Sequence, residues 1–140
     1  MQTRFPFLSL PMALTVLRVG TALLFMAHAV TRIANGTIVR FAEYMANIGF
    51  PQSTAVVWAI TAVELVAGVL MIANYYVRYS AICLFAIALG GIVLIHRHAG
   101  WFVGEHGTGG CEYSVCLMLA LIVVAAADPV RPAAGLNHRA

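Results

Sequence analysis

The sequence contains no lysine and little charge of either sign. Eight arginines and five acidic residues make up 9% of its 140 positions, whereas a soluble domain has about 25% charged residues. Hydrophobic residues make up 62%. The arginines are scattered singly, which argues against the basic stripe of a nucleic-acid-binding protein. The composition therefore predicts an integral membrane protein of one transmembrane domain, residues 1–140, with the lipid bilayer as its surroundings.

Several motifs of soluble enzymes are also missing. The three cysteines include no Cys-x-x-Cys pair, so the sequence predicts neither a disulfide framework nor dithiol chemistry. The glycines of residues 99–111 follow no strand and are not a phosphate-binding loop. There is no signature for a flavin, a haem or an iron–sulfur cluster. Any electron donor would therefore be supplied by a partner protein.

Four apolar stretches alternate with short polar connections. We expect spans at residues 12–33, 52–74, 77–96 and 112–128; the last is short, so it either begins a little earlier or lies in a thinned bilayer. Between the first two spans, residues 37–48 carry apolar side chains at helical spacing, which favours an interfacial amphipathic helix over an ordinary loop. The sequence thus predicts an all-α fold: a polytopic membrane four-helix bundle with a short interfacial amphipathic helix between the first and second spans.

The arginines are distributed almost evenly between the two sides of such a bundle. Four spans place both termini on one side. That side carries four arginines and the other three: Arg4, Arg78, Arg131 and Arg139 against Arg32, Arg40 and Arg97. The positive-inside rule then favours cytoplasmic termini.

Glu64 is the only ionisable residue of the second span and lies near its middle. An acid at that depth costs about 2.5–3.5 kcal/mol on insertion scales, so neighbouring helices must supply partners. Arg18, Phe25, His28 and Arg32 share a narrow stripe of the first span. Counting ~1.5 Å per residue from the outer side places Glu64 about 18 Å deep and Arg18 about 22 Å deep. We therefore expect an Arg18–Glu64 ion pair with His28 above it.

This pair predicts the floor of a polar pocket that opens outward between the helices. The expected ligand-binding residues are Arg18, His28, Glu64, Trp101, Glu112 and Tyr113. Glu64 and His28 are candidate proton relays, and no catalytic residue is assigned. The alternative is that the Arg18–Glu64 pair is only a clasp that fixes helix register.

A metal site is the less favoured prediction for the histidines of the outer rim. His96 and His98, together with His106, Cys111 or Glu112, have the donor atoms that zinc, copper or iron prefers. Their spacing is loose, however, and histidines at a membrane surface are often merely solvated.

From about Leu14 to Asp128 the sequence resembles the DoxX family of small four-helix membrane proteins. The matching pieces are Leu17-Arg18-Val19-Gly20, Ala27-His28, Gly49-Phe50-Pro51, Glu64-Leu65-Val66-Ala67-Gly68, Arg78, Gly100-Trp101-Phe102 and Gly109-Gly110-Cys111-Glu112-Tyr113. One departure follows His28, where Ala29 stands in place of the expected glycine and Arg32 in place of a lysine. The resemblance implies a multi-pass protein of the bacterial inner membrane. Family members are linked to respiratory-type redox chemistry, for example as the small subunit of a thiosulfate:quinone oxidoreductase, or to oxidative-stress proteins.

Three functions remain open at this point. The first is a subunit of a membrane oxidoreductase that binds quinone or another small ligand and works with a redox partner protein. The second is a non-catalytic scaffold or assembly factor, in which small-residue helix faces dock a partner. The third is a transporter for a small solute or protons, which would require a homo-oligomer because four helices without an internal repeat rarely form one.

Overall fold

The computed structural model describes residues 8–96, 100–102 and 110–128. This part of the chain contains five helices and no strand: α1 Leu10–Ala34, α2 Ile38–Asn47, α3 Ser53–Ile72, α4 Val77–Leu94 and α5 Glu112–Ala127. Three of them, α1, α3 and α4, are long and apolar enough to cross a membrane, and α5 is apolar but only 16 residues long. The prediction of an all-α membrane protein is confirmed. The fourth span, and the interfacial position of α2, stay predictions.

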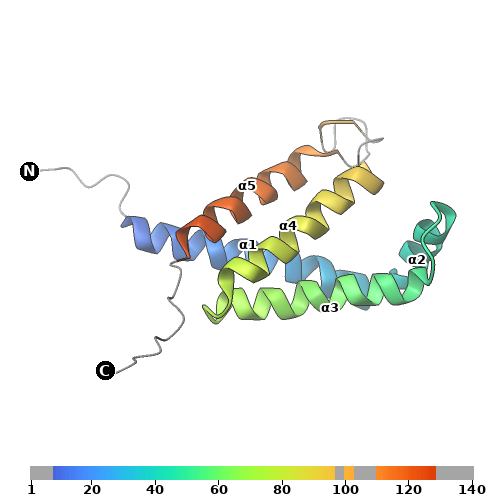
Figure 1. Cartoon of the computed structure of the whole chain (residues 1–140), viewed down its shortest axis with the longest axis horizontal. Helices are drawn as coiled ribbons and strands as arrows, with labels where there is room; N and C mark the ends of the chain where they lie inside the picture. The colour runs from blue at the N-terminus through green and yellow to red at the C-terminus, as the bar shows by residue number, and fades with distance from the viewer. Residues whose placement is uncertain (1–7, 97–99, 103–109, 129–140) are drawn as a thin grey trace, which may run out of the picture.

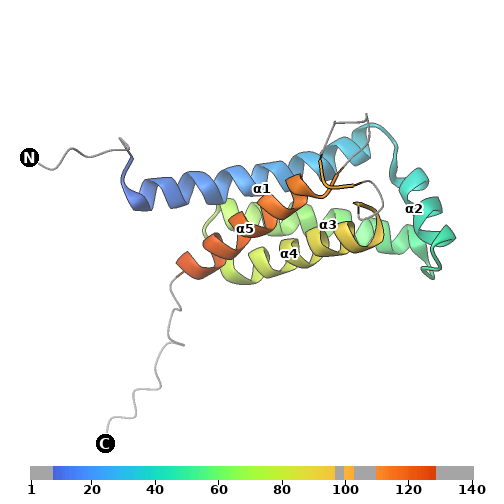
Figure 2. The same cartoon turned by 90° about the horizontal axis from the view of Figure 1, so that it is seen from above.

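The four long helices form a ring in which each contacts two others. α1 packs against α3 and α5, and α4 completes the ring by packing against the same two helices. Figures 1 and 2 show α2 across one end of this bundle, which we call the α2 end. The connection between α3 and α4, the start of α1 and the end of α5 lie at the opposite end, which we call the turn end (Figure 2).

Apolar packing is densest in the middle and at the turn end of the bundle. The residues of this core come from α1, α3, α4 and α5: Ala22, Phe25, Ala67, Met71, Val77, Ala81, Leu84, Ala88, Leu117, Leu121 and Val124. A second, smaller cluster joins α2 to the first turns of α3 through Ile38, Ala42, Met45 and Val57. Toward the α2 end, the α4–α5 pair diverges from α3 (Figure 1). The larger core therefore joins all four long helices, and the smaller cluster attaches α2 to α3.

Gly68 determines the register and the close separation of α1 and α3. A Cβ at this position would overlap the side chain of Met26 and lie 3.4 Å from the carbonyl oxygen of Ala22. The two helices can approach so closely only because residue 68 has no side chain. Gly68 is thus opposite residues 22–26, and the same antiparallel register brings Arg18 to Asn74, where the two side chains hydrogen-bond.

The connection before α5 is held by backbone contacts. The amide of Cys111 donates to the carbonyl of Gly100 at 3.2 Å, and the amide of Glu112 donates to that of Trp101 at 3.0 Å. Gly110 lies directly against this segment, because a Cβ there would collide with the backbone of Trp101 and Phe102. These contacts position the first turn of α5 at the α2 end.

Candidate functional site

The buried carboxylate of Glu64 is paired with Arg32. Nη1 of Arg32 lies 2.7 Å from Oε2 of Glu64, and Nη2 lies 3.5 Å from Oε1. Nη1 also donates to the hydroxyl of Thr61 at 2.8 Å, and that hydroxyl donates to the carbonyl of Val57. The side chains of Arg32 and Glu64 are only 15% and 4% exposed. Glu64 is therefore neutralised within the bundle by a cation from α1, as its depth requires.

The predicted Arg18–Glu64 pair is wrong, because the sequence estimate assumed that Ile33 and Gln52 lie at equal depth. The contact of Gly68 with residues 22–26 instead places Ile33 about level with Ala59, a shift of about seven residues or ~10 Å. The reason is α2, which packs on the first turns of α3 and so carries the start of α3 beyond the end of α1. Glu64 consequently lies beside the last turns of α1.

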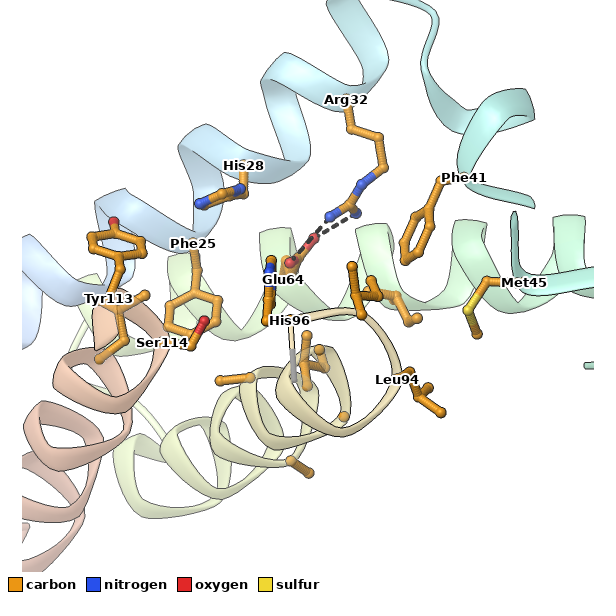
Figure 3. Close-up of a pocket in the computed structure, with 18 of the residues that line it drawn as sticks. Phe25, His28, Arg32, Phe41, Met45, Glu64, Leu94, His96, Tyr113 and Ser114 are labelled. Carbon is orange, nitrogen blue, oxygen red and sulfur yellow. Dashed lines mark hydrogen bonds and ion pairs between the residues drawn. The ribbon is translucent and has the colours of Figure 1, made fainter. Parts of the chain in front are cut away.

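A cavity of about 520 Å³ lies at the α2 end, between all five helices. Figure 3 shows the Arg32–Glu64 pair among the lining side chains, with His28 of α1 and Tyr113 of α5 near each other; His96 also lines the cavity. Six of its 21 lining residues have polar side chains: His28, Arg32, Glu64, His96, Tyr113 and Ser114. The others are apolar or glycine and come mainly from α3 and α4. The cavity thus joins a polar region to a larger apolar wall.

The sequence-predicted site residues divide into two groups. His28, Glu64 and Tyr113 line the cavity, and the rings of His28 and Tyr113 lie with their centroids 6.3 Å apart. Trp101, which is 55% exposed, and Glu112 do not line it; their contact is a backbone hydrogen bond. Arg18 lies at the turn end beside Asn74, outside the cavity.

Sequence reasoning missed Arg32 as a site residue, although the pattern contained the signal. Arg32 belongs to the same stripe of α1 as His28, and only the assumed register directed attention to Arg18. Its guanidinium carbon also lies 5.3 Å from the ring centre of Phe41, within the range of a cation–π contact. Phe41 and Met45, on the face of α2 that points to the bundle, complete the wall next to the pair (Figure 3).

A second groove, of about 760 Å³, continues from the cavity onto the outer side of α1 and α2. The two spaces share six lining residues: His28, Arg32, Phe41, Ile95, His96 and Tyr113. The groove then runs past Leu24 and Ala27 of α1, both of which are exposed. Tyr44 borders it from α2 and donates a hydrogen bond of 2.8 Å to the carbonyl of Leu94 at the end of α4. The cavity is therefore continuous with the outer surface of α1 and α2.

The described residues contain no group of three metal-ligating side chains suited to one ion. His96 lines the cavity, whereas His98 and His106 lie outside the described residues, so the predicted His96–His98 site stays a prediction. The chemistry that the cavity does offer is hydrogen bonding. Imidazole, phenol and hydroxyl groups from His28, Tyr113 and Ser114 can donate to or accept from a polar ligand, next to a neutralised ion pair.

Comparison with known proteins agrees with the sequence pattern. The family model described as DoxX matches residues 13–97, which is more than half of the chain and covers α2, α3, α4 and all of α1 except its first three residues. Neither a search of curated proteins nor a search of solved structures found a match. The matched region contains Arg32, Glu64 and most of the cavity lining. On this evidence the chain is a multi-pass membrane protein that belongs to the DoxX family.

Proposed function

We propose that this protein is the quinone-binding subunit of a membrane redox system, with the cavity at the α2 end as its ligand site. One observation carries the proposal: a 520 Å³ space with apolar walls converges on a small polar region beside a buried ion pair. Small-molecule sites are usually ~300–1,000 Å³ in volume and apolar, with a few placed polar groups. A quinone headgroup has the same division, because its ring is flat and apolar and its two carbonyl oxygens are hydrogen-bond acceptors.

The headgroup is expected next to His28 and Tyr113. These side chains lie close together on neighbouring helices, so a carbonyl oxygen placed between them can accept from either. Phe25, Phe41 and Ile87 provide flat or apolar surface for the ring. Ser114, one residue further along α5, offers another polar group to the second oxygen.

The chain would contribute protons and the partner protein electrons. Reduction of a quinone to a quinol takes up two electrons and two protons, one proton on each oxygen. His28 is placed to deliver a proton because it lines both the cavity and the outer groove. Glu64 holds Arg32 beside the cavity through the ion pair and is the second candidate for the proton relay.

The outer groove gives the route for an apolar tail. It meets the cavity at His28 and His96 and then follows the exposed residues Leu24 and Ala27 of α1. A ligand that occupies both spaces would hold its headgroup among the polar residues and its tail against the bilayer. This division favours a membrane-dissolved ligand over a water-soluble one.

Titration with a short-chain quinone analogue tests the proposal, and two glycines offer a matched pair of variants. Neither Gly90 nor Gly20 has an atom near the position of an added Cβ, but only Gly90 lines the cavity. Gly90→Leu should fill the cavity and weaken binding at least tenfold, and Gly20→Leu should leave the dissociation constant unchanged. His28→Leu should also weaken binding. Equal affinities in all four proteins would reject the site.

A scaffold role is the second candidate, and the full pairing of Glu64 favours it. Both carboxylate oxygens contact Arg32, so the pair can act as a structural clasp without any ligand. In that case Glu64→Gln would lower the stability of the protein. Gly90→Leu would leave the affinity for the quinone analogue unchanged. The titration of Gly90→Leu therefore separates the candidates.

A further inference from the structure

Arg18 lies in a separate cleft at the turn end of the bundle, far from the proposed quinone site. The cleft has a volume of about 210 Å³ and is formed by the first two turns of α1, the start of α4 and the end of α5. Thr15 and Arg18 line it from α1, Asn74 from the α3–α4 connection, and Asp128 from beyond α5. No step of the proposed quinone chemistry uses these residues.

The guanidinium of Arg18 is only partly satisfied by the protein. It donates through Nη1 to the side-chain oxygen of Asn74. Its Nε is buried and has no acceptor among the described residues. A buried donor on a charged group is costly to leave unpaired, so an acceptor from outside the described chain is expected at this position.

Arg18 also forms no ion pair with the described residues. Asp128 shares the cleft, but its carboxylate accepts the backbone amide of Arg78 at 3.2 Å. The Arg78 guanidinium donates to the carbonyls of Ala125 and Asp128 at 3.3 and 3.0 Å, which holds its positive charge against the end of α5. Arg78 therefore holds the end of α5, and no ion pair joins Arg18 to Asp128 in the described part of the chain.

The cleft lies at the depth where lipid headgroups are expected. Arg18 is level with the α3–α4 connection, where Tyr75, Tyr76 and Tyr79 are exposed and form a chain of tilted ring contacts. Exposed tyrosines at a helix end are typical of the membrane interface. A partly buried arginine at that level meets the phosphate layer of the adjacent leaflet.

We propose that this cleft binds the phosphate group of an anionic phospholipid, with Arg18 as the cation that recognises it. The phosphate oxygens supply the acceptor that Nε lacks, and the fork of the guanidinium suits two oxygens of one phosphate. Asn74 orients the guanidinium through its side-chain oxygen, and Thr15 borders the position of the headgroup. The site stands independently of quinone binding.

Native mass spectrometry of the full chain tests this proposal. The protein is released from nanodiscs that contain phosphatidylglycerol and phosphatidylcholine, and the retained phosphatidylglycerol is counted. Arg18→Gln should lower retention about fivefold, the effect of one interfacial arginine. The matched control is Arg40→Gln, because Arg40 is an exposed arginine on α2 at the other end. Thr15→Leu, which narrows the cleft and keeps the charge, should also lower retention and covers the case in which Arg18→Gln does not fold.

Three results would overturn the proposal. Unchanged retention in Arg18→Gln and Thr15→Leu would exclude the cleft. An equal loss in Arg40→Gln would show general attraction between charges rather than a site. In a parallel thermal unfolding experiment in phosphatidylcholine bicelles, phosphatidylglycerol should raise the Tm of the unmodified chain and inorganic phosphate should not. Equal protection by inorganic phosphate would assign the cleft to a free anion instead of a lipid.

Discussion

The ion pair between Arg32 and Glu64 allows a quantitative prediction about stability. Glu64 is almost completely buried and receives two contacts from a single guanidinium, of 2.7 and 3.5 Å. Removing one partner of such a pair leaves an uncompensated charge in a low-dielectric interior, which typically costs about 3–5 kcal/mol. We expect Arg32→Met and Glu64→Leu each to lower the free energy of unfolding by roughly that amount.

The double variant distinguishes a coupled pair from two independent contributions. When both charges are replaced by apolar side chains of similar size, no isolated charge remains, and the loss should fall to about 1 kcal/mol or less. The coupling energy between Arg32 and Glu64 is then several kcal/mol. Arg18→Met is the matched control, because Arg18 bonds Asn74 and lies well away from Glu64. Its effect should add to that of Glu64→Leu within about 0.5 kcal/mol.

Equilibrium unfolding in mixed micelles, with increasing dodecyl sulfate, measures these free energies. The fluorescence of Trp58 and Trp101 and the far-ultraviolet circular dichroism both report the transition. Strong coupling between Arg18 and Glu64, with additive effects of Arg32 and Glu64, would refute the helix register described above.

Three further substitutions test the packing around the site. Gly68→Leu should separate α1 from α3 by forcing Met26 aside and should cost about 1–3 kcal/mol, whereas Gly20→Ala, with open space at its Cβ, should be neutral or stabilising; thermal unfolding compares them. Gly110→Ala should disrupt the backbone contacts with residues 100–102, which hydrogen exchange of the Cys111 and Glu112 amides would detect as lost protection. Tyr44→Phe removes the hydrogen bond to Leu94 and should cost about 0.5–1.5 kcal/mol in unfolding free energy. Unchanged stability of Gly68→Leu would contradict the close contact of α1 and α3. Unchanged amide protection in Gly110→Ala would contradict the backbone contacts before α5, and unchanged stability of Tyr44→Phe would contradict the hydrogen bond to Leu94.

The helices were predictable from the sequence because their physical causes are local. Long apolar runs gave α1, α3 and α4, and apolar residues at helical spacing gave α2, whose Ile38 and Met45 are buried as the pattern implies. The buried residues of α3 also follow helical spacing, since Val57, Thr61, Glu64, Gly68 and Met71 are all buried. Thr54, one turn before Val57, is exposed, because α3 begins beyond the end of α1.

The partner of Glu64 was not predictable, because register depends on contacts between distant segments. Depth counting treats every helix as starting at the same plane, and nothing in the sequence reveals how far α2 displaces the start of α3. Two non-local contacts determine the register of α1 and α3: the packing of Met45 near Val57, and the approach of Gly68 to Met26. An error of two helical turns was enough to exchange Arg32 for Arg18.

The central claim is that a quinone binds among His28, Tyr113 and the Arg32–Glu64 pair at the α2 end. Photoaffinity labelling with an azidoquinone, mapped by peptide mass spectrometry and repeated with excess unmodified quinone, tests it most directly. We predict labels that excess quinone suppresses within residues 25–32, 87–96 and 113–117, and the loss of these labels in Gly90→Leu. Competed labels confined to the turn end, around Arg18 and Asn74, would contradict it.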